Sequence, residues 1–294
     1  MPAVTDDGAA DEPVRSVVER YYDDRVAEKL RDFTERLPRI EAAVETIAEW
    51  APPSPRRVLE IGCGVGATTW RMARAWPAAE VTGVDLSPGS IEVAKTCFRR
   101  ANLHYRNGGL GECGLTGEFD LVLMMDVYEH IAPSERPALH ALLRQLLSPE
   151  SRLLLMAPTP AHQDYLHTWL PQSLQPVDED VSPADIVRLG AEIDARLLCY
   201  REVGVWRYGD YFHAVLGRTR RLPDVALRQP TPTGRAAAKR AAKRLLGRTG
   251  AEPEALSDYL GPDLLRGVSG APAARFQVSL SERRRLAAAW TEAR

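Results

Sequence analysis

Three glycines at alternate positions mark the stretch of this 294-residue chain that is best suited to bind a ligand. Gly62, Gly64 and Gly66 follow the short apolar run 58–61, and a helical pattern begins directly after them. Glycine lets backbone approach a ligand closely, and the free N–H groups at a helix start favour an anionic or electron-rich group. The sequence therefore predicts a ligand-binding turn at residues 62–66.

Two acidic side chains stand where they could hold that ligand. Glu60 lies two residues before the first glycine, and Asp85 ends a predicted strand over 80–85, 19 residues after Gly66. At this spacing, a carboxylate at the end of the second strand accepts hydrogen bonds from both hydroxyls of a ribose. Leu86, the next residue, is then expected to lie against the adenine ring of a nucleoside.

The glycines by themselves do not settle the ligand. Gly62-x-Gly64-x-x-Ala67 also satisfies the dinucleotide fingerprint, so an NAD(P)-dependent oxidoreductase is one reading of the sequence. Against this reading, the chain has no catalytic pair of the Tyr-x-x-x-Lys type. The predicted terminal hairpin described below also fits an oxidoreductase less well.

The full pattern Glu60-x-Gly62-x-Gly64-x-Gly66 resembles the first motif of class I S-adenosylmethionine-dependent methyltransferases. The resemblance implies that Glu60 belongs to the network around the methionine part of the cofactor, beneath which the glycines pass, and that S-adenosylhomocysteine is the product. The cofactor-binding residues it implies are Tyr21, Tyr22, Glu60, Gly62, Cys63, Gly64, Gly66, Asp85, Leu86, Gly109, Leu110, Met125 and Asp126.

At two places the residues fit the family pattern less closely. Tyr21 and Tyr22 resemble lid tyrosines of the family, but their spacing equally fits one face of a packed helix. Many family members carry an acid just after the third strand, where this chain has Gly108-Gly109-Leu110-Gly111. Recognition of adenine is therefore expected to use backbone groups there, or Glu112.

The alternation of strand and helix patterns predicts an α/β fold. We expect a Rossmann-like, seven-stranded, mostly parallel sheet with a terminal antiparallel hairpin, an N-terminal helical cap and a C-terminal helical extension. The predicted strands cover 58–61, 80–85, 102–107, 119–126, 151–156, 195–206 and 211–218. The predicted divisions are 1–50 for a disordered start and the cap, 51–219 for the core with a substrate-facing insertion at 161–181, and 220–294 for a linker and a basic helical extension.

The residues that would act on the acceptor are less sharply marked. Histidine titrates near neutral pH, so the candidate bases are His130, just after the predicted strand 119–126, and His162, in the insertion. Tyr165 and Trp169 would shape an acceptor pocket or simply pack the insertion. The cysteines are scattered without a Cys-x-x-Cys pair, which argues against a zinc site.

Composition and charge set the expected partners. The chain is 45% hydrophobic and 27% charged, and its net charge of −2 hides a local charge of +9 over residues 215–250. The remainder is acidic, and the Asn/Asp-Pro-Pro-aromatic motif of base methylation is absent, so a small-molecule acceptor is favoured over nucleic acid. In the remaining reading, the protein is a non-catalytic module that docks through the basic segment 235–248. The same segment could also make a weak peripheral contact with a membrane. Neither a signal pattern nor a spanning apolar run is apparent, so a cytoplasmic enzyme is expected; the oligomeric state is left open.

Overall fold

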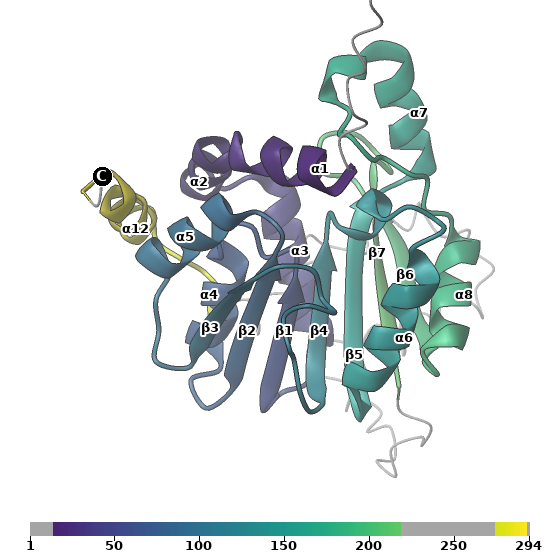
Figure 1. Cartoon of the computed structure of the whole chain (residues 1–294), viewed down its shortest axis with the longest axis horizontal. Helices are drawn as coiled ribbons and strands as arrows, with labels where there is room; N and C mark the ends of the chain where they lie inside the picture. The colour runs from purple at the N-terminus through teal and green to yellow at the C-terminus, as the bar shows by residue number, and fades with distance from the viewer. Residues whose placement is uncertain (1–13, 219–273, 293–294) are drawn as a thin grey trace, which may run out of the picture. The chain divides into compact units, whose positions relative to one another are not determined.

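The computed structural model describes residues 14–218 and 274–292, and a seven-stranded sheet lies at its centre (Figure 1). The strand order is β3-β2-β1-β4-β5-β7-β6. Strands β1 to β5 pair in parallel, and β7 pairs antiparallel with both β5 and β6. This arrangement confirms the predicted fold class, including the terminal hairpin.

The elements have the following bounds. The strands are β1 Arg57–Ile61, β2 Glu80–Asp85, β3 Leu103–Asn107, β4 Phe119–Met125, β5 Leu147–Pro158, β6 Arg196–Val203 and β7 Tyr211–Gly217. The helices are α1 Val14–Asp23, α2 Val26–Glu35, α3 Pro38–Trp50, α4 Ala67–Ala75, α5 Pro88–Cys97, α6 Arg136–Leu146, α7 Pro160–Trp169, α8 Pro183–Glu192 and α12 Leu280–Glu292.

The central strands are apolar on both faces because both faces are covered by helices. One hydrophobic cluster joins one side of the sheet to α3, α4 and α5, and a second joins the other side to α6 and α8. The carboxyl ends of β1, β2 and β4 thereby open toward α1 and α2, which lie across the top of the sheet in Figure 1. Helix α5 starts with Pro88 in its first turn, and the Ser87 hydroxyl caps it by accepting from the Ser90 N–H at 2.9 Å.

In the N-terminal cap, apolar residues recur at three- and four-residue steps from Val14 to Leu30, a spacing that predicts one continuous helix. The chain instead breaks at Asp24 and Arg25 into α1 and α2. No glycine or proline marks the break, and the apolar spacing continues across it, so periodicity alone could not reveal it. As a result, both helices can present side chains to the sheet edge.

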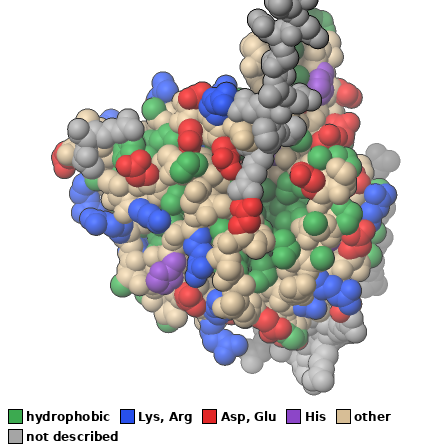
Figure 2. All heavy atoms as spheres, in the orientation of Figure 1, with side chains coloured by type: hydrophobic (Ala, Val, Ile, Leu, Met, Phe, Trp, Pro, Cys, Tyr) green, Lys and Arg blue, Asp and Glu red, His purple; other side chains and the backbone are tan. Residues whose placement is uncertain are grey.

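The C-terminal end of the chain returns to the core. Helix α12 packs against α2 and α5, and the segment before it buries Phe276 and Val278. The predicted basic helix over 235–248 lies outside the described residues, and the domain divisions at residues 50 and 219 stay predictions. None of the helices in the described ranges is long and apolar enough to cross a membrane. On the face shown in Figure 2, basic and acidic side chains are interspersed.

Candidate functional site

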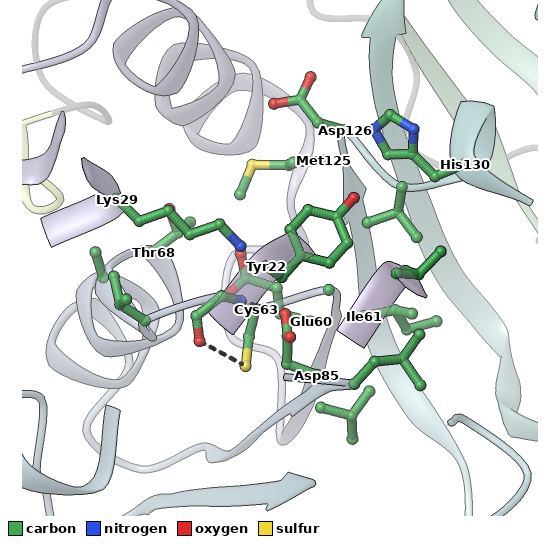
Figure 3. Close-up of a pocket in the computed structure, with 18 of the residues that line it drawn as sticks. Tyr22, Lys29, Glu60, Ile61, Cys63, Thr68, Asp85, Met125, Asp126 and His130 are labelled. Carbon is green, nitrogen blue, oxygen red and sulfur yellow. Dashed lines mark hydrogen bonds between the residues drawn. The ribbon is translucent and has the colours of Figure 1, made fainter. Parts of the chain in front are cut away.

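A pocket of about 750 Å³ lies at the carboxyl ends of β1, β2 and β4, under α1 and α2 (Figure 3). This edge is where open α/β sheets bind their ligands. The sequence-predicted residues that line the pocket are Tyr21, Tyr22, Glu60, Gly62, Cys63, Gly64, Asp85, Leu86, Gly109, Leu110, Met125, Asp126 and His130. Gly66 is not part of the lining; it caps the start of α4 instead.

Asp85 holds the glycine loop in place. Its Oδ2 accepts a hydrogen bond from the Gly64 N–H at 2.7 Å, and its Oδ1 accepts from the Ser87 N–H at 2.9 Å. The side chain is 8% exposed and lines the pocket. The Asp85 carboxylate, which is predicted to accept hydrogen bonds from ribose hydroxyls, therefore also joins the loop after β1 to the start of α5.

Glu60 lies below the loop and is 1% exposed. Its carboxyl accepts a hydrogen bond from the Thr69 hydroxyl, in the first turn of α4. Burial raises the pKa of Glu60 to about 8, because the charged form has lost its water. The side chain is therefore mostly protonated at neutral pH in the ligand-free protein.

The raised pKa of Glu60 predicts a pH-dependent stability that Glu60→Gln removes. Between its ordinary pKa of 4.5 and the folded value of about 8, the folded state keeps a proton that the unfolded state has lost. The stabilising contribution is thus complete below pH 4.5 and falls as pH rises to 8, by up to about 1.4 kcal/mol per pH unit. Urea unfolding of the ligand-free protein from pH 5 to 8 should give a flatter profile for Glu60→Gln than for the wild type. Parallel profiles would contradict the assignment.

The sequence patterns did not mark the cationic side chains of the pocket, among them Lys29 and Arg39. Lys29 directs its amine at the ring of Tyr22, 4.3 Å from the ring centroid (Figure 3). Burial lowers the pKa of Lys29, although nearby Asp85 opposes this. Arg39, at the start of α3, forms an ion pair with Asp126. No motif marks either cation, and only the fold of the cap brings them to the pocket.

His130 lies between two acids at the rim of the pocket. Its Nδ1 is 2.6 Å from the Val177 carbonyl oxygen and 3.1 Å from an oxygen of Asp178. A carbonyl can only accept, so Nδ1 carries a hydrogen. The other nitrogen, Nε2, is buried 3.6 Å from Oε1 of Glu129. Burial acts to lower the pKa of His130, but the two carboxylates outweigh it and raise that pKa.

Three more residues were predicted to act on the acceptor or to bind it. These residues, His162, Tyr165 and Trp169, lie on α7 and do not line the pocket. His162 stacks with Tyr165 at a centroid distance of 6.2 Å and with Trp206 at 6.5 Å. Trp169 is 69% exposed. From the predicted insertion it is Gln175 that lines the pocket, and its side-chain oxygen accepts from the Tyr22 hydroxyl at 2.8 Å. The roles of the three α7 residues stay predictions.

Comparison with known proteins assigns the fold and its central domain. Residues 58–150 match the family model described as a methyltransferase domain. Magnesium protoporphyrin IX methyltransferase from Synechocystis PCC 6803 superposes with a TM-score of 0.56 at 19% identity, over 70% of this chain and all of that one. Residues 58–150 are thus similar to the methyltransferase-domain family, and the described part of the chain shares its fold with that solved methyltransferase.

The curated relatives are similar over a shorter range. A ubiquinone biosynthesis O-methyltransferase from Azorhizobium caulinodans is 30% identical over 145 residues, which are 44% of this chain and 54% of the relative. A malonyl-[acyl-carrier protein] O-methyltransferase from Acetivibrio thermocellus is 35% identical over 66 residues, 22% of this chain and 23% of that protein. The chain therefore spans about half or less of the length of these relatives.

Proposed function

We propose that this protein is an S-adenosylmethionine-dependent methyltransferase that methylates an oxygen or nitrogen of a small-molecule acceptor. The observation that carries the proposal is the convergence of Glu60, the glycine loop and Asp85 on one pocket at the ligand-binding edge of the sheet. The names of the relatives favour oxygen as the methylated atom, and that of the ubiquinone enzyme favours a biosynthetic intermediate. We propose an intermediate of natural-product or glycan type, because the single core and modest insertion suit a small acceptor. A cytoplasmic location is part of the same proposal.

The residues present fit the proposed cofactor. Asp85 is a buried carboxylate at the pocket wall, suited to accept hydrogen bonds from ribose hydroxyls, and the apolar Leu86 beside it is suited to an adenine ring. Lys29, whose amine lies over the ring of Tyr22, supplies positive charge for a carboxylate, and Arg39 lies in the same lining, paired with Asp126. When bound, the cofactor supplies a methyl group attached to a sulfonium sulfur. The sulfur is a good leaving group because it departs as a neutral thioether.

The protein then has two tasks in the chemical step. It must align the acceptor atom with the methyl carbon and sulfur, so that the new bond to the methyl carbon forms as the carbon–sulfur bond breaks. It must also take a proton where the acceptor carries one. We keep His130 as the candidate base because its Nδ1 is fixed as a donor, so that Nε2 is left as the nitrogen that can accept a proton. Glu129, 3.6 Å from Nε2, would stabilise the imidazolium.

Calorimetric titration with S-adenosylhomocysteine and, separately, NADH tests the cofactor. We expect saturable binding of S-adenosylhomocysteine and no measurable heat with NADH, because Glu60 and the closely spaced glycines match the methionine-containing cofactor. Binding of NADH alone would instead support the oxidoreductase reading. The third reading, docking through the basic segment 235–248, concerns residues outside the described ranges, and no observation favours it.

A further inference from the structure

The C-terminal helix α12 lies far outside the matched methyltransferase domain, yet it packs on the cap of the pocket (Figure 1). The segment before it inserts Phe276 and Val278 into the core, and Phe276 meets the ring of Trp76 edge-on at a centroid distance of 5.1 Å. Helix α12 itself contacts α2, which carries pocket residues, and α5. The chain end is therefore well placed to influence the site.

Arg283 makes the central contact of this segment. Its side chain is fully buried, and each of its three nitrogens donates a hydrogen bond. Nε donates to the Val278 carbonyl at 3.0 Å, Nη1 to the Phe33 carbonyl at 2.7 Å and Nη2 to Oε1 of Glu41 at 3.0 Å. Phe33 lies in the last turn of α2, where carbonyls lack helical partners and attract positive charge. Arg283 thus caps α2 from a position 250 residues away in the chain.

The same carboxylate of Glu41 ties this contact to the core. Its Oε1 also accepts from Nη2 of Arg71 on α4, at 2.7 Å, and Arg71 is almost fully buried. Burial acts to raise the pKa of Glu41, but Arg71 and Arg283 together lower it. Since a buried ion pair that loses one partner leaves an uncompensated charge, α12, α3 and α4 are strongly coupled at this point.

This junction forms part of the pocket wall. Phe33, Glu41, Arg71 and Arg283 all belong to the lining, together with Lys29 one turn earlier on α2. We propose that α12 is a component of the cofactor site, in which Arg283 is a positioning residue that holds α2, with Lys29 and Phe33, against the pocket. Naming the ligand as S-adenosylhomocysteine rests on the proposed function above.

Arg283→Met tests this role in the full-length chain, since methionine keeps much of the length and loses all three donors. We expect its dissociation constant for S-adenosylhomocysteine to rise about tenfold or more. Arg283→Lys, which keeps the charge but cannot reach all three acceptors, should show a smaller rise and secures the test if the methionine variant folds poorly. Hydrogen–deuterium exchange should show faster exchange over α2 in Arg283→Met, with α8 unchanged.

Two controls separate positioning from loss of stability. Arg285→Met removes an exposed arginine of the same helix and should bind as the wild type does. Ile186→Ala opens a cavity under α8, in the opposite cluster, and should lower the melting temperature without changing affinity. The inference is overturned if Arg283→Met binds within about twofold of the wild type, or if Ile186→Ala weakens binding equally. Failure of the wild type to bind would instead reject the proposed function, and the exchange data would still decide whether Arg283 holds α2.

Discussion

Asp85→Ala is expected to weaken binding of S-adenosylhomocysteine by about 100-fold or more. The substitution removes the carboxylate that is proposed to accept hydrogen bonds from the ribose hydroxyls. It also removes the acceptor of the Gly64 N–H at 2.7 Å and of the Ser87 N–H at 2.9 Å, which loosens the glycine loop. Hydrogen bonds to charged groups contribute about 1.5–3 kcal/mol each, and each 1.36 kcal/mol is a factor of ten in affinity. Calorimetric titration of both proteins measures the difference.

Asp120→Ala is the matched control for Asp85→Ala. Asp120 also accepts two backbone hydrogen bonds, from the N–H groups of Arg56 at 2.7 Å and Arg57 at 3.1 Å, but it lies at the start of β4, at the amino edge of the sheet. We expect it to lower stability while leaving the dissociation constant within about twofold of the wild type. Wild-type affinity in Asp85→Ala would rule out Asp85 as a ligand-binding residue.

Gly66→Ala is expected to cause a large loss of stability. Gly66 has φ of +84°, a left-handed conformation that costs a non-glycine residue about 1–2 kcal/mol. An added Cβ would also lie 2.5 Å from the hydroxyl oxygen of Tyr105 and 2.7 Å from its ring carbon Cζ. Overpacking of this kind typically costs about 1–3 kcal/mol, which gives a total of about 2–5 kcal/mol. Chemical denaturation without ligand measures the loss.

Gly111→Ala provides the comparison for Gly66→Ala. Its backbone does not have a positive φ, and the nearest atom to an added Cβ is Cδ1 of Leu142 at 3.4 Å, an ordinary contact. We expect a change below about 1 kcal/mol, as for surface substitutions without special constraints. Equal stability of the two variants would mean that the chain relaxes around Gly66 and that the turn is not constrained as the structure indicates.

The sequence by itself determined the sheet, the glycine loop and the place of Asp85. These features follow from local rules: side chains alternate along a strand, helices repeat at 3.6 residues, and only glycine enters the left-handed region readily. The turn at Gly62, Gly64 and Gly66 has positive φ at all three residues, and β2 ends at Asp85 as predicted. The local sequence was sufficient to predict these features because each depends on the conformations of only a few neighbouring residues.

The tertiary structure decided which side chains complete the pocket. The unmarked break between α1 and α2 brings Lys29 to Tyr22, and the fold of the cap pairs Arg39 with Asp126. The direction of α7 leaves His162 outside the lining, although its sequence neighbourhood suggested a site residue.

The largest gap between sequence and structure concerns the chain end. Arg283 reaches the Phe33 carbonyl across 250 residues. Such contacts depend on how whole elements pack against each other. The composition and periodicity around Arg283 do not indicate that its partner is Phe33, and those around Phe33 do not indicate Arg283. The sequence therefore located the ligand-binding edge, while long-range packing selected the residues that enclose it.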